Sequence, residues 1–193
     1  MTSEKTPDPA PGPALDQAPD SSPGLVGRIL IFVEQSYEDL ELWYPKIRLE
    51  EEGYEVVVAG PEKKTYTGKN GYPCAADFAI TDINSTDFDG LVIPGGWAPD
   101  RLRRYPRVLE LVREFEAAGK TIGMICHAGW VPISAGILKG RTVTGVSAIK
   151  DDLENAGATF VDRSVVSDRH LVSSRTPADL PDFLKGMIKD LKR

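Results

Sequence analysis

Cysteine and histidine are scarce in this chain, which has two of each among its 193 residues. Two cysteines cannot form the disulfide framework typical of small secreted domains, so the sequence favours a reducing compartment. No apolar run approaches the roughly 20 residues that cross a membrane. The first residues also lack the apolar segment of a secretory signal. We therefore predict a cytoplasmic protein with no membrane partner.

An excess of basic residues is also lacking. The chain has 23 Lys and Arg residues against 29 Asp and Glu, which gives a formal net charge of −6. Nucleic-acid binding normally needs the opposite balance, so we expect no nucleic-acid partner. Arginines gather locally at positions 101, 103, 104 and 107, and such a run is typical of a solvated or subunit-facing surface.

Aromatic residues are absent from residues 1–25, which hold six of the fifteen prolines. A segment of this composition cannot bury enough apolar surface to offset the entropy lost on ordering. We therefore predict a disordered Pro/Ala-rich tail over residues 1–25. The remaining residues, 26–193, are enough for one domain with a sizeable core.

From residue 28 onward the pattern alternates between strands and helices. Continuous apolar runs at 29–33, 56–59, 91–94 and 121–125 are typical of strands buried on both faces. Asp39 can cap the first helix, whose apolar positions at helical spacing are Leu40, Trp43, Tyr44 and Ile47. Further helices are expected over 106–118, 129–136, 149–156 and 177–191, and a hairpin over 64–80. Repeated β–α units predict an α/β fold with a mostly parallel sheet, whose ligands bind beyond the carboxyl ends of the strands.

Cys126 directly follows the apolar run 121–125 and precedes His127 and two small residues. This order is typical of a nucleophile elbow, a tight turn from a strand into a helix. The positive end of the helix dipole favours a thiolate at Cys126, and His127 is a candidate base or charge partner. The turn points neighbouring side chains in different directions, which leaves their direct contact open. Backbone N–H groups of His127 and Gly96 are candidates for an oxyanion hole. Cys74 lacks this setting and is expected to be a small buried hydrophobe.

Several segments, in this order, resemble the PfpI branch of the DJ-1/PfpI (ThiJ) superfamily. They are 37–41 (YEDLE), 94–96 (PGG), 125–129 (ICHAG), 133–141 (ISAGILKGR) and 173–180 (SSRTPADL). The resemblance implies a flavodoxin-like three-layer sandwich over about residues 28–191. It implies that Cys126 is the nucleophile and that the carboxyl group of Glu41 hydrogen-bonds its sulfur. It also implies that no metal or organic cofactor takes part.

The same resemblance implies that His127 joins the site and that an acid from a neighbouring subunit orients its ring. That acid falls on Asp100, where the family pattern often has the longer glutamate. A homodimer or larger homo-oligomer is therefore expected to complete the site. Trp130 stands where the family often shows Gln, and with Trp97 it either reshapes the pocket mouth or packs at an interface.

The resulting prediction is a cysteine-dependent stress-protection enzyme of the PfpI type. We expect it to act on small reactive carbonyl compounds or their protein adducts, as a glyoxalase or deglycase does. An intracellular cysteine peptidase is the first alternative. A redox sensor or chaperone-like protein, in which Cys126 oxidises without turnover, is the second. A class I glutamine amidotransferase is disfavoured, because the downstream His170 is followed by Leu171-Val172 rather than by a His-x-Glu pattern.

Overall fold

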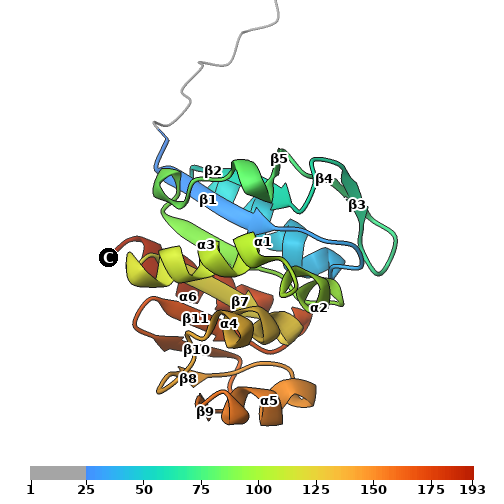
Figure 1. Cartoon of the computed structure of the whole chain (residues 1–193). Coiled ribbons are helices and arrows are strands. Elements are labelled where there is room, and N and C mark those ends of the chain that lie inside the picture. The colour runs from blue at the N-terminus through green and yellow to red at the C-terminus, as the bar shows by residue number, and fades with distance from the viewer. Residues whose placement is uncertain (1–24) are drawn as a thin grey trace, which may run out of the picture.

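The computed structural model describes residues 25–193, so the tail predicted for residues 1–25 lies outside the described residues apart from Leu25. A central sheet is built from seven strands, namely β1 (Gly27–Phe32), β2 (Tyr54–Gly60), β5 (Phe78–Ala79), β6 (Gly90–Ile93), β7 (Thr121–Ile125), β10 (Val165–Asp168) and β11 (Leu171–Ser174). Their order in space is β10-β11-β7-β6-β1-β2-β5 (Figure 1). All neighbours are parallel except β10 and β11, which form an antiparallel edge.

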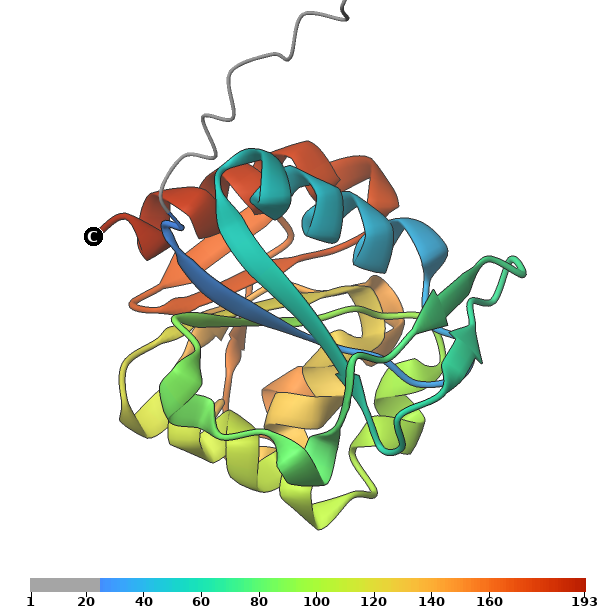
Figure 2. The same ribbon diagram turned by 90° about the horizontal axis from the view of Figure 1, so that it is seen from above.

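Helices cover both faces of this sheet, as Figure 2 shows. The helices α1 (Asp39–Glu51) and α6 (Leu180–Leu191) lie against each other on one face. The other face carries α3 (Pro106–Ala117) and α4 (Trp130–Ala135), with the shorter α2 (Ala98–Leu102) and α5 (Lys150–Asn155) beside α4. Two small sheets lie outside the main one, the antiparallel hairpin of β3 (Thr65–Thr67) and β4 (Pro73–Ala75) and the parallel pair of β8 (Thr142–Val143) and β9 (Thr159–Phe160). The predicted three-layer α/β sandwich is confirmed. No helix within residues 25–193 is long and apolar enough to cross a membrane.

The middle strands form the core of the protein. Every residue of β6 and β7 is buried, as expected for parallel strands with helices on both faces. Each large apolar side chain buried there stabilises the fold by about 1.5–3 kcal/mol. Because β1, β6 and β7 are adjacent and parallel, their carboxyl ends meet at one edge of the sheet. The loops that leave these three strands therefore lie together.

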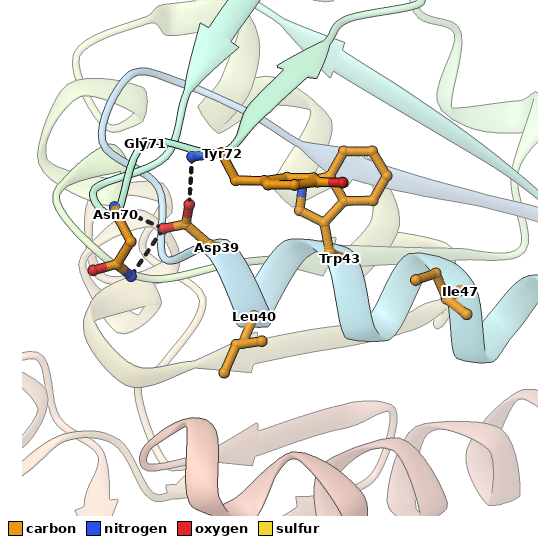
Figure 3. A pocket seen from close by; sticks show the side chains of 7 residues that line it. All are labelled: Asp39, Leu40, Trp43, Ile47, Asn70, Gly71 and Tyr72. Carbon is orange, nitrogen blue, oxygen red and sulfur yellow. Dashed lines mark hydrogen bonds between the residues drawn. The ribbon is translucent and has the colours of Figure 1, made fainter.

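The apolar positions that the sequence pattern marks on helix α1 are not on the side that the helix buries. The apolar positions Leu40 and Ile47 are 57% and 52% exposed, whereas Glu41 and Leu42 are fully buried. Leu42, Leu49 and the buried Glu41 lie on the side of α1 that meets the sheet. The apolar positions at helical spacing therefore lie toward the outer side of the helix. Three of these positions, Leu40, Trp43 and Ile47, line a groove of about 560 Å³ together with Tyr72 (Figure 3).

The cap predicted at Asp39 is also wrong. Asp39 is the first residue of α1, Glu38 occupies the N-cap position, and no side chain there makes a capping bond. The carboxylate of Asp39 instead accepts hydrogen bonds from the turn between β3 and β4 (Figure 3). A contact distant in sequence has taken the place of the local cap.

Candidate active site

Cys126 lies at the carboxyl end of β7, where the strand turns into a short 3-10 helix (Cys126–Gly129) that leads into α4. Its φ angle is +62°, in the left-handed region that residues with a side chain rarely occupy. A strained residue at a strand-to-helix turn is the mark of a nucleophile elbow. The elbow predicted from the sequence is therefore present, with Cys126 at its tip and partly exposed.

Glu41 reaches the same place from the first turn of α1 and is fully buried. Its Oε2 atom accepts a hydrogen bond of 2.8 Å from the backbone N–H of Gly95. Gly95 lies between Glu41 and Cys126, because a methyl group on it would come within 2.5 Å of Glu41 Oε2 and 2.8 Å of Cys126 Cβ. Only glycine leaves the two side chains this close.

The protonation of Glu41 follows from its burial. Burial is the main reason that the pKa of Glu41 is raised to about 8. The hydrogen bond from the Gly95 N–H lowers this pKa, and the negative charge of Glu38 raises it. Glu41 therefore holds its proton at neutral pH. Burial also raises the pKa of the Cys126 thiol, as does a charged Glu41, whereas the N–H groups of His127 and Gly96 lower it. A neutral Glu41 carries no charge that would oppose a thiolate at Cys126. Its proton is available to the sulfur or to a substrate oxygen.

The side chain of His127 contacts that of Cys126, which answers the question that the sequence left open. Its Nδ1 atom lies 3.3 Å from Cys126 Sγ. The ring lies between those of Trp97 and Trp130, at centroid distances of 5.6 Å and 5.1 Å. Burial lowers the pKa of His127, and the positive charge of Lys69 lowers it further, so the ring is neutral near pH 7. In the tautomer protonated at Nε2, Nδ1 is free to take the thiol proton.

The candidate oxyanion hole combines the elbow with the loop after β6. The backbone N–H groups of His127 and Gly96 both act on the sulfur of Cys126. Gly96 has a φ of +74°, and a Cβ there would lie 2.5 Å from the backbone nitrogen of Glu38. The loop is fixed from both sides, since Trp97 N–H donates to Ser36 O at 2.8 Å and Glu38 N–H donates to Gly95 O at 3.2 Å. The donors are therefore pre-positioned, as oxyanion stabilisation requires.

Asp100 does not join this group within one chain. It lies in α2, its side chain is 46% exposed, and its carboxylate pairs with Arg104 at 2.6 Å. No hydrogen bond or ion pair joins Asp100 to His127 within the described residues of a single chain. Trp97, next to His127, is 59% exposed, so the histidine lies close to the surface of the chain.

Two charged residues of the site were not predicted as site residues. The side chain of Glu38 is only 6% exposed and forms a 2.5 Å ion pair with Lys69 Nζ. Lys69 comes from the turn between β3 and β4, and the only sequence signal was the glycine-rich hairpin pattern around it. Within residues 25–193 no group of three or more His, Cys, Asp or Glu side chains is arranged to hold a metal ion.

Known proteins share this arrangement of strands and loops. A family model described as DJ-1/PfpI matches residues 27–190. The chain belongs to the DJ-1/PfpI family. It is 44% identical, over 86% of its length and 99% of the relative, to a protein of Pyrococcus furiosus named deglycase PfpI.

Two further DJ-1/PfpI relatives extend the comparison. A Bacillus subtilis protein whose name provisionally assigns it to the cysteine proteases is 41% identical over 86% of this chain and 98% of its own. The crystal structure of an Anabaena variabilis protein with a DJ-1/ThiJ/PfpI-like and a ferritin-like domain superposes with a TM-score of 0.84 at 38% identity. The match covers 86% of this chain and 48% of that one. These names associate the family with enzyme activity, but the reaction that they name differs: a deglycase in one relative and a cysteine protease in another.

Proposed function

We propose that this DJ-1/PfpI protein is a cysteine-dependent enzyme that protects against small reactive carbonyl compounds, acting on 2-oxoaldehydes or their adducts as a glyoxalase or deglycase. The observation that carries the proposal is the 3.3 Å approach of His127 Nδ1 to Cys126 Sγ beside a buried, protonated Glu41. The deglycase name of the Pyrococcus relative points the same way.

The proposed first step is addition of the thiol to an aldehyde. Cys126 Sγ forms a bond to the carbonyl carbon as its proton passes to His127 Nδ1, and the carbonyl electron pair moves onto oxygen. The N–H groups of Gly96 and His127 stabilise that oxygen until it takes a proton, which gives a hemithioacetal.

Proton transfer and hydrolysis complete the proposed reaction. To give a thioester, the proton on the former aldehyde carbon moves to the neighbouring carbon, and the hydroxyl proton of the hemithioacetal moves to the oxygen of that neighbouring carbon. These transfers need an acid and a base, and Glu41, with a pKa of about 8, is suited to both roles. Water then cleaves the thioester and restores the thiol. The net change is one 2-oxoaldehyde plus one water to one 2-hydroxy acid, with no external oxidant or reductant.

A substrate panel tests this proposal against its alternative. Peptide hydrolysis would use the same nucleophile, and the name of the Bacillus relative favours it. We expect the wild-type protein to convert methylglyoxal to lactate with saturable kinetics, and Cys126→Ala to show none of this activity. Cleavage of unstructured peptides without methylglyoxal turnover would reverse the order of the two functions.

We also propose that a homo-oligomer completes the site, with Asp100 of a second copy orienting His127. The exposure of the Asp100 side chain supports this arrangement, since its carboxylate is accessible to a second copy of the chain. Asp100→Asn is expected to lower kcat by about tenfold, because the imidazole loses its orienting carboxylate. Mixing Asp100→Asn with Cys126→Ala should then restore activity, to about a quarter of wild type for randomly mixed dimers. A mixture no more active than its components would place Asp100 outside the site.

A further inference from the structure

The turn between β3 and β4 is fastened to the start of α1 by several hydrogen bonds. Asp39 Oδ2 accepts from the backbone N–H of Asn70 at 2.9 Å and from its side chain at 3.1 Å, and Oδ1 accepts from the N–H of Tyr72 at 2.9 Å (Figure 3). The hydroxyl of Tyr37 donates to the carbonyl of Tyr72 at 2.6 Å. The turn is therefore fixed over the helix that carries Glu38 and Glu41.

This anchoring fixes the backbone of Lys69, which directly precedes Asn70. Its N–H donates to the carbonyl of Tyr37 at 2.8 Å, directly before Glu38. A side chain on Gly68 would collide with the carboxylate of Asp39, so the turn approaches α1 as closely as the backbone permits. From this position the ammonium of Lys69 reaches Glu38 Oε2 at 2.5 Å.

The ion pair lies at the boundary between the buried site and the solvent. The Glu38 side chain is 6% exposed and the Lys69 side chain is 43% exposed. In this geometry Glu38 Oε2 has no other hydrogen-bond partner within the described residues. Lys69 is thus the cation that balances Glu38, and without it a buried carboxylate would lie uncompensated beside the site.

The charge of Lys69 also acts on the three groups of the proposed chemistry. It lowers the pKa of Glu41 and that of His127, and the negative forms of Cys126 and Glu41 in turn raise the pKa of Lys69. The contribution of Glu38 has the opposite sign, since its charge raises the pKa of Glu41.

We propose that Lys69 is a positioning residue of the site. Its ammonium group neutralises the buried Glu38, so that the negative charge of Glu38 does not oppose the Cys126 thiolate. The inference deepens the proposed function, because it concerns the same nucleophile. It does not depend on the identity of the substrate, since it is a statement about how readily the thiol ionises.

The test measures the reaction of Cys126 with iodoacetamide from pH 6 to 10, with no substrate present, in proteins that carry Cys74→Ser. Lys69→Met is expected to slow this reaction about tenfold at pH 8, as a rise of one unit in the apparent thiol pKa would do. Lys69→Arg should keep most of the wild-type rate. Lys64→Met is the matched control, because Lys64 lies on the same hairpin and pairs with the exposed Glu62 at 3.0 Å. It should leave the profile unchanged.

A double variant separates charge compensation from a merely structural role. Glu38→Gln removes the charge that Lys69 balances, so Glu38→Gln/Lys69→Met should recover the rate lost in Lys69→Met. A local collapse of the turn would slow both variants alike, and circular dichroism with thermal melts would check the fold of each. An unchanged alkylation profile in Lys69→Met, or no recovery in the double variant, overturns the proposal. Failure of methylglyoxal turnover alone would count against the proposed function and leave this inference standing.

Discussion

Replacing Cys126 by serine is expected to lower kcat/KM for methylglyoxal by on the order of 10³-fold or more, because loss of a nucleophile removes the covalent route altogether. A serine hydroxyl ionises far less readily than a thiol, so a neutral His127 at 3.3 Å cannot activate it to the same degree. Steady-state kinetics of lactate formation measure the effect.

The second cysteine provides the matched control. Cys74 lies in β4 and is only 3% exposed, so a substrate cannot reach its sulfur and it is not expected to act as a nucleophile. Cys74→Ser should keep the wild-type kcat/KM. Equal turnover by wild type and Cys126→Ser would remove the basis for a cysteine mechanism in this protein.

Replacing Glu41 by glutamine is expected to make the protein more stable and less active at once. An ordinary glutamate has a pKa of 4.5, and that of Glu41 is about 8. Between these values the folded state binds more protons than the unfolded state, so this residue lowers the free energy of unfolding as pH rises from 4.5 to 8. At pH 7 the cost is about 3 kcal/mol, which glutamine avoids because it carries no charge.

Thermal melts at several pH values measure this gain. Glu41→Gln should raise Tm by roughly 5–10 °C at pH 7 and by little at pH 4, where the carboxyl group is already neutral in both states. The variant should also lose on the order of 10²-fold in kcat, since an amide cannot transfer the proton. Glu34→Gln is the control, because both Glu34 oxygens accept hydrogen bonds, at 2.6 Å from Gln35 N–H and at 3.2 Å from Tyr105 OH. No gain in Tm is expected there, and an unstabilised Glu41→Gln would contradict the assigned pKa.

Much of the scaffold was predictable because buried parallel strands leave continuous apolar runs. Those runs located β1, β2, β6 and β7, and the rule that parallel strands end at one edge placed Glu41, Gly96 and Cys126 at one cleft. The role of Glu41 entered through the resemblance to PfpI proteins, since an acid in the first turn of a helix is unremarkable by itself. The contact between Cys126 and His127 needed the structure, because the elbow fixes backbone direction and leaves the imidazole rotamer open.

The failures share a physical cause. Periodicity alone identified the apolar positions of α1 that include Leu40 and Ile47. Periodicity does not tell which side of a helix meets the sheet, and in α1 that side carries Leu42, Leu49 and a buried acid. Asp39 was predicted as a local cap and instead binds a turn some thirty residues later. Lys69 was missed for the same reason, since its place depends on how that turn docks.

The hairpin of β3 and β4 forms a two-stranded sheet of its own, outside the seven-stranded sheet whose strand β7 leads into Cys126. The central sheet and the hairpin whose turn carries Lys69 are therefore separate structural units. Segments of this kind can change in length or sequence while the sheet and the elbow stay intact. Exchange of the turn between relatives offers evolution, or a protein engineer, a route to new substrate preferences that leaves the folding core untouched.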